Sequence, residues 1–268
     1  MVRACVLALL LLGWVSAVAS AAEPPGLAKA RAAYNAQDFG GAIAAAASVR
    51  LQPEWADAAA LVMGRSHIER YRRTSDPSDL VSGREILGSI RSAALSPRDR
   101  VDHIVGLGQA LYLGELFGAA AEIFDTALGG SPLLSQADRH LLLDWWATAL
   151  DKEAQTQPWD QRKSVYERIT TKVDRALAED PANPVANYWL AVAARGTGDL
   201  DRAWNAAIAA WVRASLDRAH AAQLRLDLDR LVSQALIPER ARTRVVRGSE
   251  DPVTILRDEW ERVKESFR

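Results

Sequence analysis

Apolar and small residues recur along most of the chain at intervals of three and four, the spacing of one face of an α-helix. The pattern is clearest in residues 97–132, where one apolar stripe ends near Leu111 and a second runs through Phe117 and Phe124. Gly114 lies in the short interruption between the two stripes and marks a turn. No segment shows the alternating pattern of a half-buried strand, so the sequence predicts an all-α protein.

Polar caps and prolines predict where further helices begin. Ser96-Pro97 and Asn183-Pro184 each combine a side chain that caps an N-terminus with a proline at the first helical position. The pair that begins at Asn183 turns near Gly198. Together with the two stripes of residues 97–132, the signals predict helices over residues 27–36, 39–51, 54–73, 80–94, 135–155, 161–179, 216–236 and 251–268.

The central unit, residues 97–132, resembles a tetratricopeptide repeat. We expect Gly108 and Ala120 where its two helices cross, since a larger side chain there would hold the backbones apart. The positions that match the repeat pattern are Leu107, Gly108, Leu111, Phe117, Ala120, Phe124, Ala127 and Pro132. Weaker copies follow Ala30 and Tyr188. The small residues Ala42, Ala120 and Ala203 are 78 and 83 positions apart, whereas two exact repeats span about 68, which predicts lengthened helices or loops between units.

The resemblance implies a right-handed α-solenoid of antiparallel helix pairs over residues 22–236. Residues 237–250 are polar and rich in arginine, and we expect them to form a linker. Residues 251–268 carry Trp260 and Phe267 on one apolar face and resemble the helix that covers the end of a solenoid.

The N-terminus has the pattern of a secretory signal peptide, predicted over residues 1–21. Arg3 precedes an apolar run, and Ala19-Ser20-Ala21 forms a small-x-small cleavage site. The expected location is therefore beyond the inner membrane, in the periplasm; an uncleaved anchor remains the alternative. Cys5, the one cysteine, lies within this segment, so a cleaved chain has neither disulfides nor a thiolate. Abundant alanine, and arginine in place of lysine, are typical of a GC-rich bacterial genome.

Composition and motifs favour binding over catalysis. The net charge of −1 argues against nucleic acid as a partner. Gly106-Leu107-Gly108 follows no predicted strand, which argues against a nucleotide-binding loop. No cofactor or metal site is expected, because no two histidines have ligand spacing among His67, His103, His140 and His220. We expect no enzymatic activity, although a hydrolase with a site assembled across the fold stays open.

The resemblance also implies where a partner binds. In tetratricopeptide solenoids the first helix of each pair lines a concave groove that holds peptides. Transfer by register gives the partner-binding candidates Arg31, Tyr34, Arg65, Glu69, Asp102, Gln109, Tyr112, Asp144, Thr148, Tyr188 and Arg195. Such a mixture of tyrosine, arginine and amide groups suits extended backbone and carboxylates. We expect a buried core rather than a ligand cage for Trp145, Trp146, Trp159, Trp189, Trp204 and Trp211.

These features predict an exported, non-catalytic scaffold or adaptor that binds a protein or peptide in its groove. The alternative is an accessory subunit of a tripartite-type envelope transporter that encloses a small apolar ligand. A polar groove would favour the peptide, and a continuous apolar wall the small ligand. The arginines of the predicted linker could meet an anionic membrane, although a solvated linker is favoured: Arg240, Arg242, Arg244 and Arg247. The oligomeric state is open.

Overall fold

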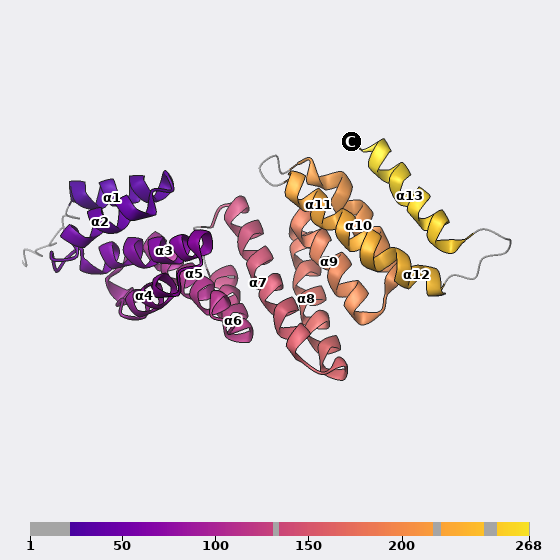
Figure 1. Ribbon diagram of the computed structural model, residues 1–268, viewed down its shortest axis with the longest axis horizontal. Coiled ribbons are helices and arrows are strands. Elements are labelled where there is room, and N and C mark those ends of the chain that lie inside the picture. The colour runs from indigo at the N-terminus through magenta and orange to yellow at the C-terminus, as the bar shows by residue number, and fades with distance from the viewer. Residues whose placement is uncertain (1–21, 131–133, 217–220, 244–250, 268) are drawn as a thin grey trace, which may run out of the picture.

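The computed structural model describes residues 22–130, 134–216, 221–243 and 251–267, and these residues form helices that follow one another along an elongated molecule (Figure 1). The described part contains no strand, so the predicted all-α class is confirmed. The helices are α1 (Pro25–Asn35), α2 (Phe39–Val49), α3 (Ala56–Thr74), α4 (Pro77–Gly88), η1 (Ser92–Ala94), α5 (Pro97–Leu113), α6 (Phe117–Gly130), α7 (Gln136–Thr156), α8 (Trp159–Glu179), α9 (Pro184–Thr197), α10 (Leu200–Ala214), α11 (Ala221–Leu231), η2 (Val232–Leu236), α12 (Ile237–Thr243) and α13 (Pro252–Ser266).

Each helix packs against its neighbour in sequence, from α1 and α2 through to α10 and α11. The first helices of successive pairs also contact one another, α1 with α3, α3 with α5, α7 with α9 and α9 with α11. Sequential packing of this kind is typical of an all-α solenoid. The first helices therefore form a layer in two parts, α1, α3 and α5 and then α7, α9 and α11, and these two parts carry the cavities described below.

The same turn joins the two helices in three of the pairs. Gln37, Glu115 and Gly198 adopt left-handed backbone conformations with φ of 62°, 59° and 88°. In each turn the next amide donates to the carbonyl five residues earlier, as from Asp38 to Ala33 at 2.9 Å. This is the Schellman ending of a helix. The three turns are 78 and 83 residues apart, the same separations as the small residues Ala42, Ala120 and Ala203, so the same turn recurs at matching places in the pattern.

Glycines permit the closest helix contacts. A Cβ atom on Gly108 would lie 2.5 Å from the Phe124 ring, so the expectation that this glycine lies at a close helix contact is confirmed. A Cβ atom on Gly106 would instead meet Arg65 at 3.2 Å, on a different neighbouring helix. Both glycines lie inside α5, which explains the Gly-Leu-Gly sequence by packing rather than by a phosphate-binding loop.

The core is small at one end and large at the other. One cluster of mainly alanine and valine joins α1, α2 and α3, a second joins α3, α4 and α5, and a third extends from α5 to α13. Trp146 and Trp260 are 1% and 0% exposed in the third cluster. The tryptophan prediction is wrong for Trp159, which is 78% exposed because it begins α8 at the surface, and Phe267 is likewise exposed at the end of α13.

The predicted linker begins as a helix. Residues 237–243 form α12, which continues α11 through the π-helical turn η2. Pro238 offers no amide hydrogen and its ring is incompatible with an α-helical turn before it, which accounts for the wider turn. The amide of Ile237 donates to the carbonyl of Val232, five residues earlier. Arg244 and Arg247 lie outside the described residues, as does the predicted signal peptide.

Trp260 anchors α13 to the rest of the molecule. Its ring lies 5.4 Å from that of Trp211 and 6.2 Å from that of Trp204, both on α10. Its indole nitrogen donates to Asp229 of α11 at 2.9 Å. The terminal helix thus packs against α10 and α11. Of the helices described, none combines the length and the apolar character needed to cross a membrane.

Candidate functional site

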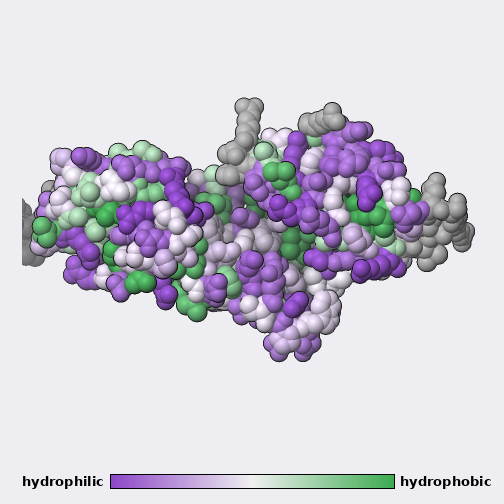
Figure 2. All heavy atoms as spheres, in the orientation of Figure 1, coloured by the Kyte–Doolittle hydropathy of each residue, from purple (hydrophilic) through white to green (hydrophobic). Residues whose placement is uncertain are grey.

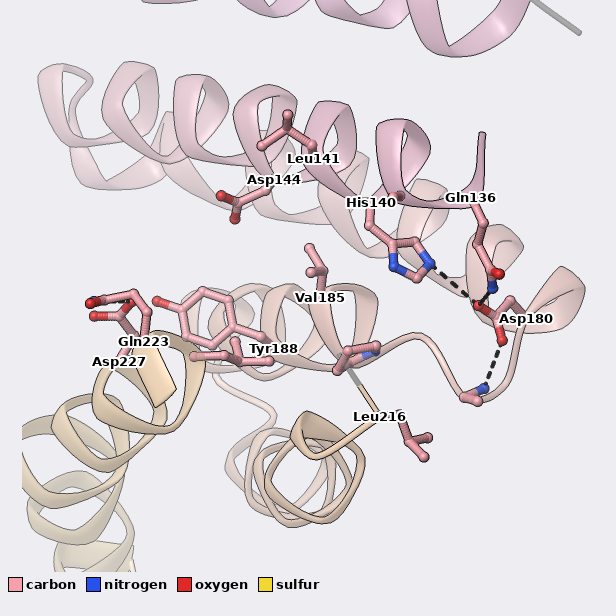
Figure 3. A pocket seen from close by; sticks show the side chains of 14 residues that line it. Gln136, His140, Leu141, Asp144, Asp180, Val185, Tyr188, Leu216, Gln223 and Asp227 are labelled. Atoms are coloured by element: carbon pink, nitrogen blue, oxygen red, sulfur yellow. Dashed lines mark hydrogen bonds and ion pairs between the residues drawn. The ribbon is translucent and has the colours of Figure 1, made fainter. Parts of the chain in front are cut away.

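A cavity of about 600 Å³ lies among α7, α9 and α11, and we call it the C-terminal cavity (Figure 3). Its middle is apolar, with Leu141, Val185 and Leu224 among the lining residues. Polar side chains gather at its two ends. Leu141 and Leu216 are 50% and 65% exposed, so this wall leaves apolar surface in contact with water.

One end of the C-terminal cavity is a hydrogen-bonded group around Asp180. This carboxylate accepts from Nε2 of Gln136 at 2.8 Å and lies 3.4 Å from Nε2 of His140. It also accepts from the amide of Ala182 at 3.1 Å. Since Asp180 follows the end of α8, these bonds tie the loop before α9 to the start of α7.

The other end holds Asp144, Tyr188 and Asp227, from three different helices (Figure 3). Asp144 accepts from Nε1 of Trp189 at 2.8 Å, and Asp227 accepts from the side chain of Gln223 at 3.0 Å. Burial raises the pKa of the Tyr188 hydroxyl, and the carboxylates of Asp227 and Asp144 raise it further. The phenol therefore stays neutral, in a negative local potential.

A second cavity, of about 360 Å³, lies among α1, α3 and α5, and we call it the N-terminal cavity. The guanidinium of Arg65 stacks over the Tyr34 ring at 4.9 Å and approaches Asp102 at 3.3 Å. Arg98 reaches the same Asp102 carboxylate at 3.6 Å. Charged groups of both signs therefore face one another across this cavity.

Arg31 closes one side of the N-terminal cavity through a bidentate bond. Its two terminal nitrogens donate to Asp99 at 2.9 and 3.0 Å, while Nε donates to Glu23 at 2.7 Å. Asp99 is buried and also accepts from the hydroxyl of Ser96, the residue that caps α5. The pKa of Arg31 is raised by the bonds to Asp99 and Glu23 against the opposing effect of its burial. This arginine links α1 to the start of α5.

The structure brings six of the eleven predicted partner-binding residues to the two cavities. The N-terminal cavity is lined by Arg31, Tyr34, Arg65 and Asp102, and the C-terminal cavity by Asp144 and Tyr188. The remaining five line neither cavity: Glu69, Gln109, Tyr112, Thr148 and Arg195.

Several of these five have structural contacts of their own. Tyr112 meets Trp145 edge-on at 5.2 Å and so bridges α5 and α7. Arg195 donates to both carboxylate oxygens of Glu239 on α12, at 2.6 to 3.1 Å. Gln109 is buried within α5. Tyr112 and Arg195 therefore join neighbouring helices.

Sequence reasoning missed most of the C-terminal cavity wall. Asp227 is not among the residues predicted from register; it approaches Arg230 at 3.4 Å and also lines the cavity. Leu141 and Val185 lie one turn before the predicted Asp144 and Tyr188, where apolar residues on a first helix indicate core equally well. The periodic pattern alone could not separate a cavity wall from a core contact.

Among the described lining residues of the C-terminal cavity there is no serine, cysteine or lysine to act as a covalent nucleophile. Within the residues that the structure describes, no group of three or more histidine, cysteine, aspartate or glutamate side chains is placed to hold a metal ion. No family model matches the sequence, and neither the curated proteins nor the solved structures yielded a similar one.

Proposed function

We propose that this protein is an exported, non-catalytic scaffold that binds a peptide segment of a partner protein along the layer of first helices. The observation that carries the proposal is that first helices supply most of the lining of both cavities, α1, α3 and α5 in one case and α7, α9 and α11 in the other. In the second cavity, Asp180, Ala182 and Leu216 are added from loops. A ligand that follows this layer passes polar groups from every pair.

The proposed architecture is a right-handed tetratricopeptide-like solenoid of antiparallel pairs. Its support is the recurring Schellman turn at Gln37, Glu115 and Gly198, together with the close glycine contact between Gly108 and Phe124. The export to the periplasm rests on the signal-peptide pattern of residues 1–21.

The lining favours a peptide. The C-terminal cavity has polar ends and an apolar middle, and the N-terminal cavity is polar throughout much of its wall. On the face seen in Figure 2, hydrophobic residues form small separate patches rather than one continuous area. Peptides need such alternation, because backbone and side chains present both polar and apolar groups.

A small apolar ligand, bound by an accessory subunit of a tripartite-type transporter, is the second candidate. The observation in its favour is the size of the C-terminal cavity, about 600 Å³, which falls within the range of small-molecule sites, about 300–1,000 Å³. The carboxylates at one end of this cavity argue against a ligand that is apolar over its whole length.

Crosslinking in the native envelope tests the proposal. The tagged protein is captured after crosslinking, and its partners are identified by mass spectrometry. Val185→Trp fills the C-terminal cavity, while Leu51→Trp, at a residue 85% exposed, is the matched control. We expect one dominant protein partner that is retained by L51W and lost by V185W, with melting temperatures alike. Recovery of transporter subunits would support the second candidate, and recovery of the chain alone would contradict the scaffold.

A further inference from the structure

We propose that the middle of the C-terminal cavity binds one large apolar side chain of the partner's peptide, while the Tyr188 hydroxyl donates a hydrogen bond to a backbone carbonyl beside that side chain. This inference rests on the proposed scaffold function and adds the chemistry of the residue that anchors the peptide.

The wall in the middle of the cavity is apolar and open to solvent. Leu141 of α7 and Leu216, which follows α10, are 50% and 65% exposed. Val185 of α9 and Leu224 of α11 are partly exposed on the same wall. A ligand that removes these side chains from water gains free energy in proportion to the apolar area it covers. An apolar group of the ligand therefore suits this part of the cavity.

The carboxylate at one end of the cavity already has partners within the protein. Asp180 accepts from Nε2 of Gln136 at 2.8 Å and from the amide of Ala182 at 3.1 Å. The same carboxylate lies 3.4 Å from Nε2 of His140. A charged group of the ligand would have to compete with these contacts, whereas a neutral side chain leaves them intact.

The carboxylates at the other end are likewise engaged. Asp144 accepts from the indole of Trp189 at 2.8 Å. Asp227 accepts from the side chain of Gln223 at 3.0 Å and approaches Arg230 at 3.4 Å. The polar ends of the cavity therefore do not require a charge from the ligand, and the apolar middle is the part that a ligand completes.

Tyr188 provides a hydrogen-bond donor between the two ends. Its hydroxyl points toward the end where Gln223 and Asp227 lie, and none of the described residues forms a hydrogen bond with it (Figure 3). Burial raises the pKa of this hydroxyl, so it keeps its proton and can donate. A peptide supplies a backbone carbonyl as acceptor, whereas a hydrocarbon ligand would cover the donor without a partner. The hydroxyl thus favours a peptide over a hydrocarbon as the source of the apolar group.

The size of the cavity agrees with a large side chain. Its volume of about 600 Å³ leaves room for the side chain together with the backbone on either side of it. Burial of a leucine or phenylalanine side chain favours binding by about tenfold to a hundredfold relative to leaving it in water. One such residue can therefore dominate the affinity of a short peptide.

Selection from a random dodecapeptide library displayed on phage tests the inference with the full mature chain. Leu141→Asn places an amide in the apolar wall, and Leu226→Asn makes the same change at an exposed leucine of α11 outside the lining. We expect the wild type and L226N to enrich leucine, phenylalanine or tryptophan at one fixed position by at least about tenfold. L141N should lose most of this enrichment, with melting temperatures alike in all three proteins.

Fluorescence polarisation then measures the most enriched peptide. Replacing its anchor residue with alanine should weaken binding to the wild type by at least about tenfold. Tyr188→Phe keeps the ring and loses the donor, so it should weaken binding by about threefold to tenfold. Tyr71→Phe, at a partly exposed tyrosine of α3 outside the cavity, is the matched control and should leave the affinity unchanged.

Four results would overturn the inference: an enriched anchor that is charged or polar, enrichment that persists in L141N, no enriched position at all, or equal affinities of Y188F and the wild type. Binding of 1-hexanol in a thermal-shift titration, without any enriched peptide, would overturn the peptide as the source of the apolar group.

The two proposals fail separately. A captured partner whose crosslinked segment contains no large apolar residue overturns the apolar anchor and leaves the scaffold standing. Selection of peptides with an apolar anchor in vitro, without any captured partner, overturns the scaffold and leaves the chemistry of the cavity standing.

Discussion

The two cavities both lie against first helices, yet they differ in chemistry. In the N-terminal cavity, arginines and aspartates bond to each other, as Arg31 does to Asp99 and Arg65 to Asp102. In the C-terminal cavity, apolar side chains separate Asp180 from the pair Asp144 and Asp227. The difference teaches that two cavities on first helices can be built with different chemistry: one is crossed by ion pairs between helices, and the other keeps an apolar wall between its charged ends.

The hydrophobic cores next to the two cavities also differ, in the size of their side chains. The cluster under α1 to α3 consists of alanine, valine and a single leucine, Leu27. The cluster from α5 to α13 contains Trp146 and Trp260, and a buried tryptophan removes far more apolar area from water than alanine does. The N-terminal part has less buried area, so its ion pairs between helices matter more for stability.

The largest expected effect comes from Trp260→Ala, which removes the fully buried ring that joins α13 to α10. We expect the free energy of unfolding in urea to fall by about 3–5 kcal/mol. Trp159→Ala, at the exposed start of α8, is the matched control and should change it by less than about 0.5 kcal/mol. Similar losses in the two variants would show that burial of tryptophan does not dominate this half.

The next effect tests the ion pairs. Asp99→Ala removes the buried carboxylate that holds Arg31 and should lower the free energy of unfolding by about 2 kcal/mol. Asp201→Ala breaks the exposed pair with Arg240 in the C-terminal half and should cost about 0–1 kcal/mol. Both are measured by urea unfolding. A larger loss of unfolding free energy for Asp201→Ala than for Asp99→Ala would contradict the greater importance of ion pairs in the N-terminal part.

Acid should weaken the N-terminal half through Asp79. This buried carboxylate accepts from Arg70, and from His67 at 2.8 Å when that ring donates, and the bond from Arg70 is the main reason that its pKa is lowered. A lowered pKa means that the carboxylate stabilises the fold above its unfolded pKa of about 3.9 and loses this effect as the pH falls below it. We expect Asp79→Asn to cost about 1–2 kcal/mol at pH 7.

The difference in the free energy of unfolding between the wild type and Asp79→Asn should shrink when unfolding is measured from about pH 4 downward. Glu167→Gln provides the control, because its side chain is exposed. A gap between wild type and D79N that is constant with pH would rule out the carboxylate as the origin.

The smallest effect concerns the contact between the two halves. The guanidinium of Arg72 on α3 lies 5.4 Å from the ring of Trp145 on α7, which also meets Tyr112. Arg72→Ala should lower the free energy of unfolding by about 0.5–1 kcal/mol. Arg100→Ala, on an exposed position of α5, should have a smaller effect in the same urea experiment. Equal losses of unfolding free energy in the two variants would show that the contact between Arg72 and Trp145 does not stabilise the fold.

The sequence predicted those features that are formed by residues close together in the chain. Ser96 and Asn183 cap α5 and α9 as expected, because a cap is formed within one helical turn. The close contact at Gly108 also followed from a local pattern, a small residue on each of two helices joined by a short turn.

The cavities could not be predicted in the same way. Asp144, Tyr188 and Asp227 come from helices of three different pairs, and their approach depends on how those pairs pack. Five arginines and aspartates were named from register, but register could not reveal that Arg31 would be bonded to Asp99. The π-helical turn before Pro238 was missed because proline usually signals a helix end.

Photo-crosslinking from within the groove tests the central claim most directly. A benzophenone amino acid is placed in the full chain at Leu141 in the C-terminal cavity, at Asn35 in the N-terminal cavity and at the exposed Leu226 on α11. The account predicts that a partner peptide is crosslinked most strongly at Leu141, more weakly at Asn35 and at background level at Leu226. Equal yields at Leu141 and Leu226 would contradict it.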